Sequence, residues 1–484
     1  MDNSLFVQIE HKIDHDDFEG AQQLLQGIVL DEVSGHQRSR FFFLLAKTYF
    51  EREMDDLVMP TLQNVFENAD EFVEIDRAYL IAAVLHVFKA EEKEGDEKHA
   101  DLLQARTFFD RIRDPAKLSI NEQDIYYFRR GLMELYSNRL EESIRNLETV
   151  LTINSADGDK AAVHGYLADA YKDLKDYEKA IRYYDLAIEN TTPDKPNDIA
   201  FHKIDKARIL DILKQPVASK KLIEEVLKEF DSGKEKENLE IAMYSQDVLG
   251  QAFYSLKDYQ SSLNCYNQSL NLATKLGKDT TPYLFDISRA RWALGDSKNS
   301  ENIALKAIET TKNDTYKQLL HTELFHQYLH SDRYEEAIDI LHQLIEKYPD
   351  CENLGWAYLM IGHMHSLLDK HREAIDFFKR SLNVLDEDDE DRLSALDFTA
   401  YCYLKLESVD KAMKICFEII EEYPERPNLA WTHAVLARCY FEKGMKIEAR
   451  EHAEKAQQYK PPESEVYSFS ENVLADILKD LGIE

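Results

Sequence analysis

Glycine, proline and cysteine are scarce in this chain of 484 residues, with 15, 11 and 5 copies. Folds built from many strands need many turns, and turns draw on glycine and proline, so the composition argues against all-β and collagen-like architectures. Disorder is also disfavoured, because 23 Phe and 26 Tyr residues are far more than a solvated coil carries. No stretch approaches about 18 uninterrupted apolar residues, so we expect no membrane-spanning helix.

Basic residues are outnumbered, since 59 Lys and Arg face 92 Asp and Glu and leave a net charge of −33. Proteins that bind nucleic acid show a basic patch or stripe, and this sequence has none, so we expect no nucleic-acid partner. Insertion into or attraction to an anionic membrane is disfavoured for the same reason. The acidic field would accelerate encounters with a basic protein or peptide partner. Solubility of a long helical surface explains the same charge without any partner.

The five cysteines match no metal-binding or disulfide spacing, and their number is odd. Most lie inside apolar helical patterns, where a thiol behaves as a small hydrophobic group and suits a reducing compartment. They are Cys265, Cys351, Cys402, Cys416 and Cys439. Residues 1–6 lack the basic and apolar regions of a signal peptide. These features predict a cytoplasmic protein.

A pattern of small and aromatic residues recurs along the chain with a step of mostly about 37 or 38 residues. Its copies begin near residues 2, 39, 78, 124, 161, 199, 243, 281, 318, 355, 393 and 430. The clearest copy contains Leu167, Ala168, Tyr171, Tyr177, Ala180, Tyr184 and Ala187. Small residues suit the points where two helices approach most closely, and aromatic rings fill the gap to the next pair. Each copy therefore predicts a helical hairpin with a first helix A and a second helix B.

The pattern resembles the tetratricopeptide repeat, although its step exceeds the family's usual 34 residues. The resemblance implies an all-α fold, a right-handed α-solenoid (superhelix) of about twelve hairpins. It is strong within residues 121–462, which we expect to form a regular array. Residues 1–120 are predicted to be degenerate repeats, and residues 463–484 a capping helix that covers the last repeat.

In this family, helix A lines a concave face that usually holds an extended peptide or a helix. The family places about the second, fifth, ninth and twelfth residue of each copy inward, and these positions hold all three tryptophans of the chain. Aromatic and Arg residues carry most interface energy. The resulting candidate ligand-binding residues are Tyr244, Tyr254, Phe285, Arg289, Trp292, His326, Trp356, His363, Tyr401, Trp431, Arg438 and Phe441. The competing interpretation is that aromatic residues such as Trp356 and Trp431 pack on the preceding repeat.

The sequence suggests no catalytic residue, metal site or cofactor. His326 and His330 share a helix face but belong to no HExxH motif, and the acidic run 386–391 lacks the glycine and ligand spacing of a calcium loop. A carboxylate clamp of the co-chaperone type is also disfavoured, because no Asn follows the inward Lys203 at the required spacing. We therefore expect a protein that is not an enzyme.

The sequence favours a non-catalytic scaffold or adaptor that binds a peptide or helix of a partner protein on the concave face. One alternative is a regulator of the quorum-sensing response type, whose repeats close around a small signalling peptide. Another is a structural subunit of a larger complex, with the convex surface or the termini as contacts.

Overall fold

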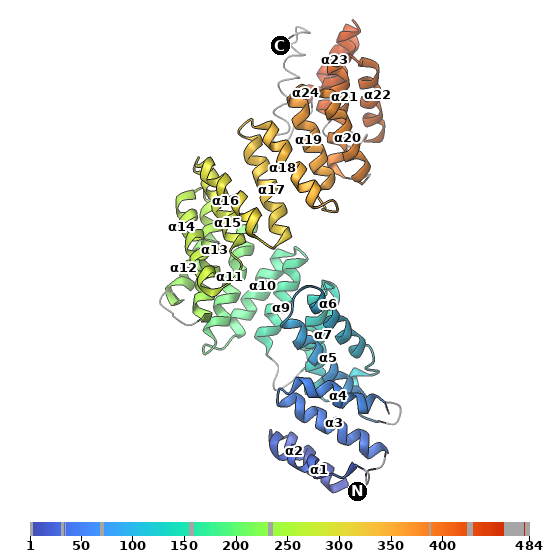
Figure 1. Cartoon of the computed structure of the whole chain (residues 1–484), viewed down its shortest axis with the longest axis vertical. Coiled ribbons are helices and arrows are strands. Elements are labelled where there is room, and N and C mark those ends of the chain that lie inside the picture. The colour runs from blue at the N-terminus through green and yellow to red at the C-terminus, as the bar shows by residue number, and fades with distance from the viewer. Residues whose placement is uncertain are drawn as a thin grey trace. The chain divides into compact units, whose positions relative to one another are not determined.

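The computed structural model describes residues 3–30, 33, 35–67, 72–153, 159–230, 236–386, 389–423, 429–458 and 479 (Figure 1). Within these residues the backbone forms 24 α-helices, the short 3₁₀ helix η3 (Pro115–Lys117) and no strand. The chain divides into two compact units, Met1–Leu276 and Gly277–Glu484, called unit 1 and unit 2 below. The predicted all-α fold of about twelve hairpins is confirmed. The predicted capping helix 463–484 lies outside the described residues, except for Lys479.

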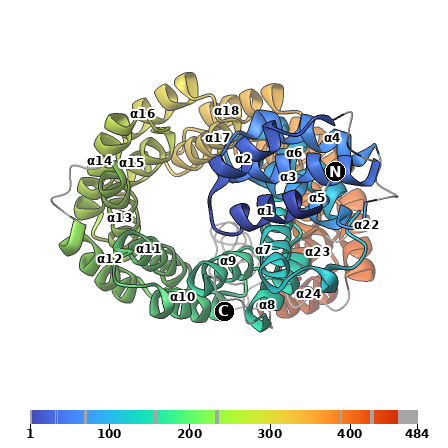
Figure 2. The same ribbon diagram turned by 90° about the horizontal axis from the view of Figure 1, so that it is seen from below.

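The described residues of unit 1 form seven helical hairpins, in which odd-numbered helices are helix A and even-numbered helices are helix B. Their bounds are α1 (Asn3–Ile13), α2 (Phe18–Gln26), α3 (Gly35–Glu51), α4 (Asp55–Phe66), α5 (Ile75–Glu91), α6 (Gly95–Phe109), α7 (Ile120–Tyr136), α8 (Leu140–Thr152), α9 (Lys160–Asp173), α10 (Tyr177–Asn190), α11 (Pro196–Ile212), α12 (Pro216–Phe230), α13 (Lys236–Ser255) and α14 (Tyr259–Leu276). Figure 2 shows α9, α11 and α13 on one side of this stack and α10, α12 and α14 on the other.

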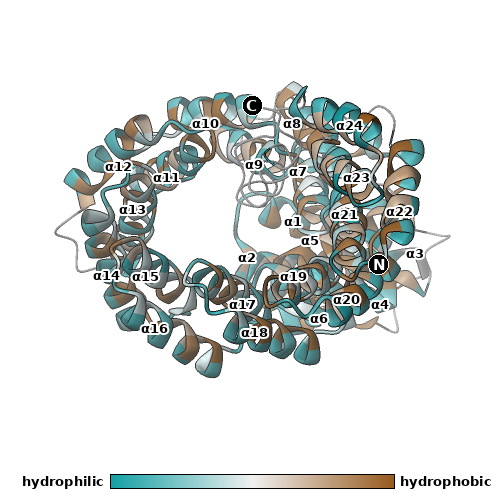
Figure 3. Cartoon of the chain, turned by 90° about the horizontal axis from the view of Figure 1, so that it is seen from above, coloured by the Kyte–Doolittle hydropathy of each residue, from teal (hydrophilic) through white to brown (hydrophobic). Residues whose placement is uncertain are grey.

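The described residues of unit 2 form five hairpins with the same alternation. Their bounds are α15 (Thr281–Ala293), α16 (Ser297–Thr310), α17 (Asp314–Leu329), α18 (Tyr334–Lys347), α19 (Leu354–Leu367), α20 (His371–Val384), α21 (Glu390–Lys405), α22 (Val409–Glu422), α23 (Ala430–Glu442) and α24 (Lys446–Gln458). In Figure 3, α15 and α17 lie on one side and α16 and α18 on the other, and each helix carries both apolar and polar stretches. Such amphipathic helices bury one stripe against their neighbours and leave the other in water.

Eleven of the twelve hairpin turns in the described residues reverse the chain in the same way. Each of these eleven turns holds one residue in the left-handed region, and in the hairpin of α5 and α6 the left-handed residue is Gly95, the first residue of α6. In the turn from α9 to α10, Lys175 has φ +62°, its N–H donates to the carbonyl of Lys172, and the next N–H, of Asp176, donates to the carbonyl of Tyr171. This pair of hydrogen bonds is a Schellman motif, which ends helix A. The side chain of Asp176 then caps helix B by accepting from the N–H of Lys179.

Glycines in helix A let the two helices of a hairpin approach closely. A Cβ atom on Gly250 of α13 would lie 2.7 Å from the ring of Tyr266 in α14. A Cβ atom on Gly362 of α19 would lie 2.5 Å from the ring of Phe378 in α20. Tyr266 and Phe378 are both fully buried, so each ring fills the space that the glycine leaves open. The repeat pattern predicted this role for the small residues of helix A, and the packing confirms it.

The hydrophobic core runs between successive hairpins of each unit rather than through one central layer. In unit 1 the largest cluster joins residues from Phe6 to Met133, and in unit 2 the largest joins residues from Ala304 to Cys439. Repeat arrays bury their apolar faces in this way, each hairpin against its neighbours. Among the described residues, no helix has the length and hydropathy needed to cross a membrane.

Candidate functional site

Five of the predicted ligand-binding residues form a partly exposed row on the first three helices A of unit 2. Phe285, Arg289 and Trp292 lie on α15, His326 lies on α17 and Trp356 lies on α19. His326 is exposed, and the other four are partly exposed. We call these five residues the open helix-A face.

Ring and charge contacts hold the open helix-A face in place. The guanidinium of Arg289 lies 5.5 Å from the ring centroid of Phe285 and 3.9 Å from the Glu323 carboxylate of α17. The rings of His326 and Trp356 are 6.0 Å apart, and this contact links α17 to α19. A cation beside an aromatic ring gives a surface that can bind apolar and charged groups of a ligand together.

Three predicted residues of the later repeats are instead buried between helices A. His363 of α19 stacks on Phe398 of α21 with ring centroids 4.7 Å apart. Tyr401 of α21 lies 5.4 Å from Trp431 of α23. His363, Tyr401 and Trp431 are 8%, 6% and 7% exposed, so their rings connect neighbouring repeats. Burial lowers the pKa of His363 to about 4, and its imidazole is therefore neutral at pH 7.

The remaining four predicted residues are partly exposed. In α13 of unit 1, Tyr244 lies under the guanidinium of Arg208 at 5.5 Å, and Tyr254 packs against Tyr259 of α14 at 5.2 Å. In α23 of unit 2, Arg438 pairs with Glu442 at 2.9 Å and lies 5.4 Å from the ring of Phe441. The structure thus places the predicted residues on helices A, and a role in ligand binding stays a prediction.

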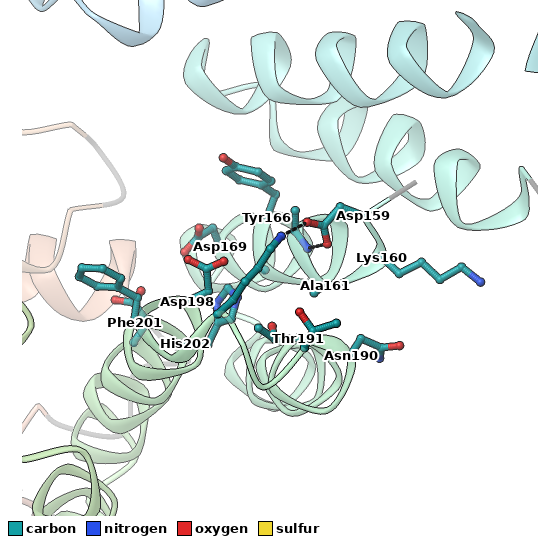
Figure 4. Close-up of a pocket in the computed structure, with 15 residues that line it drawn as sticks. Asp159, Lys160, Ala161, Tyr166, Asp169, Asn190, Thr191, Asp198, Phe201 and His202 are labelled. Atoms are coloured by element: carbon teal, nitrogen blue, oxygen red, sulfur yellow. Dashed lines mark hydrogen bonds and ion pairs between the residues drawn. The ribbon is translucent and has the colours of Figure 1, made fainter. Parts of the chain in front are cut away.

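A pocket of about 600 Å³ lies in unit 1 between α9, α11 and the end of α10 (Figure 4). From α9 come residues spaced by three or four, which share one helix face. From α11 come residues with the same kind of spacing, and the segment 190–195 closes one end. The lining residues are Asp159, Lys160, Ala161, Ala162, Gly165, Tyr166, Asp169, Asn190, Thr191, Thr192, Lys195, Asp198, Phe201, His202 and Asp205.

Contacts between α9 and α11 fix the shape of this pocket. Gly165 lets α11 approach, because a Cβ atom there would lie 2.6 Å from Cε1 of His202. Asp169 accepts a 2.6 Å hydrogen bond from the buried Tyr184 hydroxyl and pairs with Lys172 at 2.6 Å. In Figure 4 the carboxylates of Asp169 and Asp198 lie beside the ring of His202.

Burial changes the titration of two pocket residues in opposite senses. It lowers the pKa of His202, although the surrounding aspartates act against this shift. It raises the pKa of Asp205, and Arg208 and Lys172 offset this only in part. The pocket therefore holds a neutral imidazole and carboxylates whose charge is incompletely balanced.

Sequence reasoning missed this pocket. Its α11 residues Asp198, Phe201 and Asp205 follow the same second, fifth and ninth spacing as the predicted inward positions, but counted from residue 197 instead of 199. The start of α11 could have been found from Pro196, its first residue, because proline favours the first position of a helix.

The histidines do not assemble a metal site in the part of the chain that the structure describes, where no group of three or more His, Cys, Asp or Glu residues could hold an ion. His321 of α17 is buried, and its Nδ1 lies 2.6 Å from the carbonyl oxygen of Lys317. His326 and His330 are exposed.

Comparison with known proteins connects this architecture to one family. Two family models, both described as tetratricopeptide repeat, match residues 163–191 in unit 1 and 320–387 in unit 2. No curated protein matches the sequence.

Two solved structures share the fold at low sequence identity. One is the apo form of the quorum sensor NprR from B. thuringiensis, with a TM-score of 0.52 and 14% identity over 71% of this chain and 98% of that one. The other is a signal transduction ATPase with numerous domains and a tetratricopeptide repeat sensor from Pyrococcus horikoshii. Its TM-score is 0.52, with 14% identity over 92% of this chain and 74% of that one. At such identity the similarity establishes the fold alone.

Proposed function

We propose that this chain, which is a tetratricopeptide-repeat protein, acts as a non-catalytic adaptor that binds a peptide or helix of a partner protein. The proposed binding surface in unit 2 is the open helix-A face. The supporting observation is that His326 is exposed and Phe285, Arg289, Trp292 and Trp356 are partly exposed on three successive helices A. Isolated apolar residues on a surface are ordinary, but a row of aromatic side chains around an arginine is typical of interface hot spots.

The ligand would lie across the three helices and bury apolar side chains against Phe285, Trp292 and Trp356. Arg289 already lies near the carboxylates of Asp286 and Glu323, so it can pair with a ligand carboxylate or backbone carbonyl only by exchanging these contacts. His363, Tyr401 and Trp431 would support the neighbouring repeats without contacting the ligand, because they are buried. The net charge of −33 favours basic or mixed-charge ligands.

The experiment is selection of a randomised decapeptide display library on the full-length protein, followed by affinity measurements with the enriched peptides. The test variant combines Arg289→Ala with Trp292→Ala. The matched control combines Leu305→Ala with Lys306→Ala, which removes one apolar and one cationic side chain from the exposed surface of α16. We expect the test variant to bind roughly tenfold more weakly and the control to match wild type within about twofold.

Two results would reject this proposal. Enriched peptides could bind the test variant as tightly as wild type, which would move the site away from α15. The library could also yield no peptide that binds wild type above background. Circular dichroism of both variants would show that their helical content is intact.

A second candidate is a peptide-responsive regulator, and the shared fold with the quorum sensor NprR favours it. In that case a bound peptide would change the arrangement of the repeats. Small-angle scattering with and without a selected peptide separates the two candidates, because an adaptor keeps its radius of gyration and a regulator of this type becomes more compact.

A further inference from the structure

The pocket between α9 and α11 has the size and chemistry of a small-ligand site. Ligand sites commonly enclose about 300–1,000 Å³ and combine apolar walls with a few polar groups, and this pocket measures about 600 Å³. Tyr166 and Phe201 supply aromatic surface, and Ala161 and Ala162 supply aliphatic surface. The neutral ring of His202 adds a flat wall without adding positive charge.

The polar lining favours a cation. Four carboxylates line the pocket, those of Asp159, Asp169, Asp198 and Asp205, against two ammonium groups. One of these, on the exposed Lys160, extends away from the other lining side chains in Figure 4.

An ammonium group from the chain itself already occupies one edge of the pocket. Lys195 precedes α11, and its Nζ lies 3.1 Å from the carboxylate of Asp159 at the start of α9. This contact shows that the pocket rim can accommodate a cationic head on an alkyl stem. The other three carboxylates also line the cavity: Asp198 is exposed, Asp169 pairs with Lys172 at 2.6 Å, and Asp205 pairs with Arg208 at 3.3 Å. A bound cation would therefore share Asp205 with Arg208.

We propose that this pocket binds an organic cation, a guanidinium or ammonium group on a short apolar stem. The charged head would lie between Asp198 and Asp205, and the stem would pack against Tyr166 and Phe201. The head can be an arginine or lysine side chain of a peptide, or a free polyamine. The site lies wholly in unit 1, so its test is independent of the test of the open helix-A face in unit 2.

The test uses the full-length protein and three probes in isothermal titration calorimetry at low ionic strength. Nα-acetyl-arginine methylamide represents a peptide side chain, spermidine represents a free polyamine, and Nα-acetyl-citrulline methylamide is the uncharged equivalent of the arginine probe. We expect a cationic probe to bind at least about tenfold more tightly than the citrulline probe. The tighter of the two cationic probes identifies the source of the cation.

Three variants connect this binding to the pocket. Asp198→Asn combined with Asp205→Asn removes the carboxylates at the head position and should weaken cation binding by about fivefold to twentyfold. Ala162→Phe keeps every charge but fills the cavity, and it should also weaken binding. Asp194→Asn is the control. Asp194 is exposed and lies in the segment 190–195, which closes one end of the pocket, but its side chain does not line the pocket.

Several outcomes would overturn the proposal. Equal binding of the arginine and citrulline probes would show that charge does not matter. An equal effect of Asp194→Asn and the double variant would show that the overall charge acts rather than the pocket. Absence of binding for every cationic probe at up to about 10 mM would show that the pocket is no cation site.

Discussion

At the residue scale, burial decides what each predicted side chain can do, and Asp397 shows this for ionisation. It lies on α21, is 7% exposed and accepts a 2.7 Å hydrogen bond from the Thr432 hydroxyl of α23. Burial raises the pKa of Asp397 to about 7, although the hydrogen bond from Thr432 acts in the opposite direction. In the unfolded chain the pKa of an aspartate is about 3.9.

We predict that Asp397 makes unit 2 less stable as the pH rises. Between about pH 4 and pH 7 the folded chain holds this proton and the unfolded chain does not, so stability is lost as the pH passes through the folded pKa. The change amounts to at most about 4 kcal/mol, and Asp397→Asn should remove it. Urea unfolding followed by tryptophan fluorescence reports on unit 2, because all three tryptophans, Trp292, Trp356 and Trp431, lie there.

The control is Asp386→Asn, which changes an exposed carboxylate at the end of the preceding hairpin. It should leave the pH profile of stability parallel to that of wild type. A profile for Asp397→Asn that also runs parallel to wild type between pH 4.5 and 7.5 would contradict the assignment.

Truncation of Tyr401 and of Trp292 should have different effects on stability. Tyr401 is 6% exposed and packs on Trp431, so Tyr401→Ala should lower the free energy of unfolding by about 3 kcal/mol. Trp292 is partly exposed, so Trp292→Ala should cost only about 1 kcal/mol. Both variants keep Trp356 and Trp431 for fluorescence in urea. Equal losses would mean that the helix-A residues do not divide into an exposed and a buried group.

At the element scale, the twelve hairpins could be predicted from the sequence because packing in this fold repeats. Small residues such as Gly250 and Gly362 recur where helices approach, and this regular spacing gives the helix order along the chain. The spacing does not show whether an inward residue meets solvent or the next helix A. Trp356 and Trp431 are both the second residue of their copies, and only their neighbours leave Trp356 partly exposed and make Trp431 buried.

The pocket in unit 1 could not be predicted because the repeat pattern misplaced the start of α11. The repeat start near residue 199 lies inside α11, which begins at Pro196. A shift of two residues rotates a helical position by about 200°, which moves side chains from one face to the other. Ala200 and Ala207, two of the inward positions in that frame, are 2% and 0% exposed, and the pocket is lined by Asp198, Phe201 and Asp205 instead.

The hairpin turns lead to a prediction about backbone strain. Nine of the eleven left-handed turn residues are not glycine, although this region favours glycine. Glu407, with φ +58° between α21 and α22, is one of them, so Glu407→Gly should stabilise unit 2 by up to about 1 kcal/mol. Gly295 has φ +80° between α15 and α16, so Gly295→Ala should destabilise unit 2 by about 1 kcal/mol.

Urea unfolding by tryptophan fluorescence measures both turn variants. Lys379→Gly serves as the control, because it places a glycine at an exposed position inside α20. There it should destabilise by about 1 kcal/mol, the opposite sign to Glu407→Gly. A loss of stability in Glu407→Gly would show that another interaction of the glutamate outweighs the strain.

At the scale of the whole molecule, the repeats are carried by both units, since one family model matches within unit 1 and another within unit 2. The two proposed binding surfaces are likewise divided, with the cation pocket in unit 1 and the open helix-A face in unit 2. What the units share is charge, because acidic residues exceed basic ones by 33 along the chain.

This charge predicts how a cationic peptide reaches the protein. Long-range attraction accelerates encounter and is screened by salt, whereas contacts formed after docking are screened much less. For an arginine-containing peptide from the library selection, the association rate constant should fall about tenfold between 20 and 300 mM NaCl, and the dissociation rate constant should change less than about twofold. Stopped-flow fluorescence measures both constants.

The control is the same peptide with citrulline in place of arginine. It should associate more slowly, and its association rate constant should depend little on salt. An equal salt dependence for the two peptides would mean that the acidic surface keeps the protein in solution but does not steer its ligand.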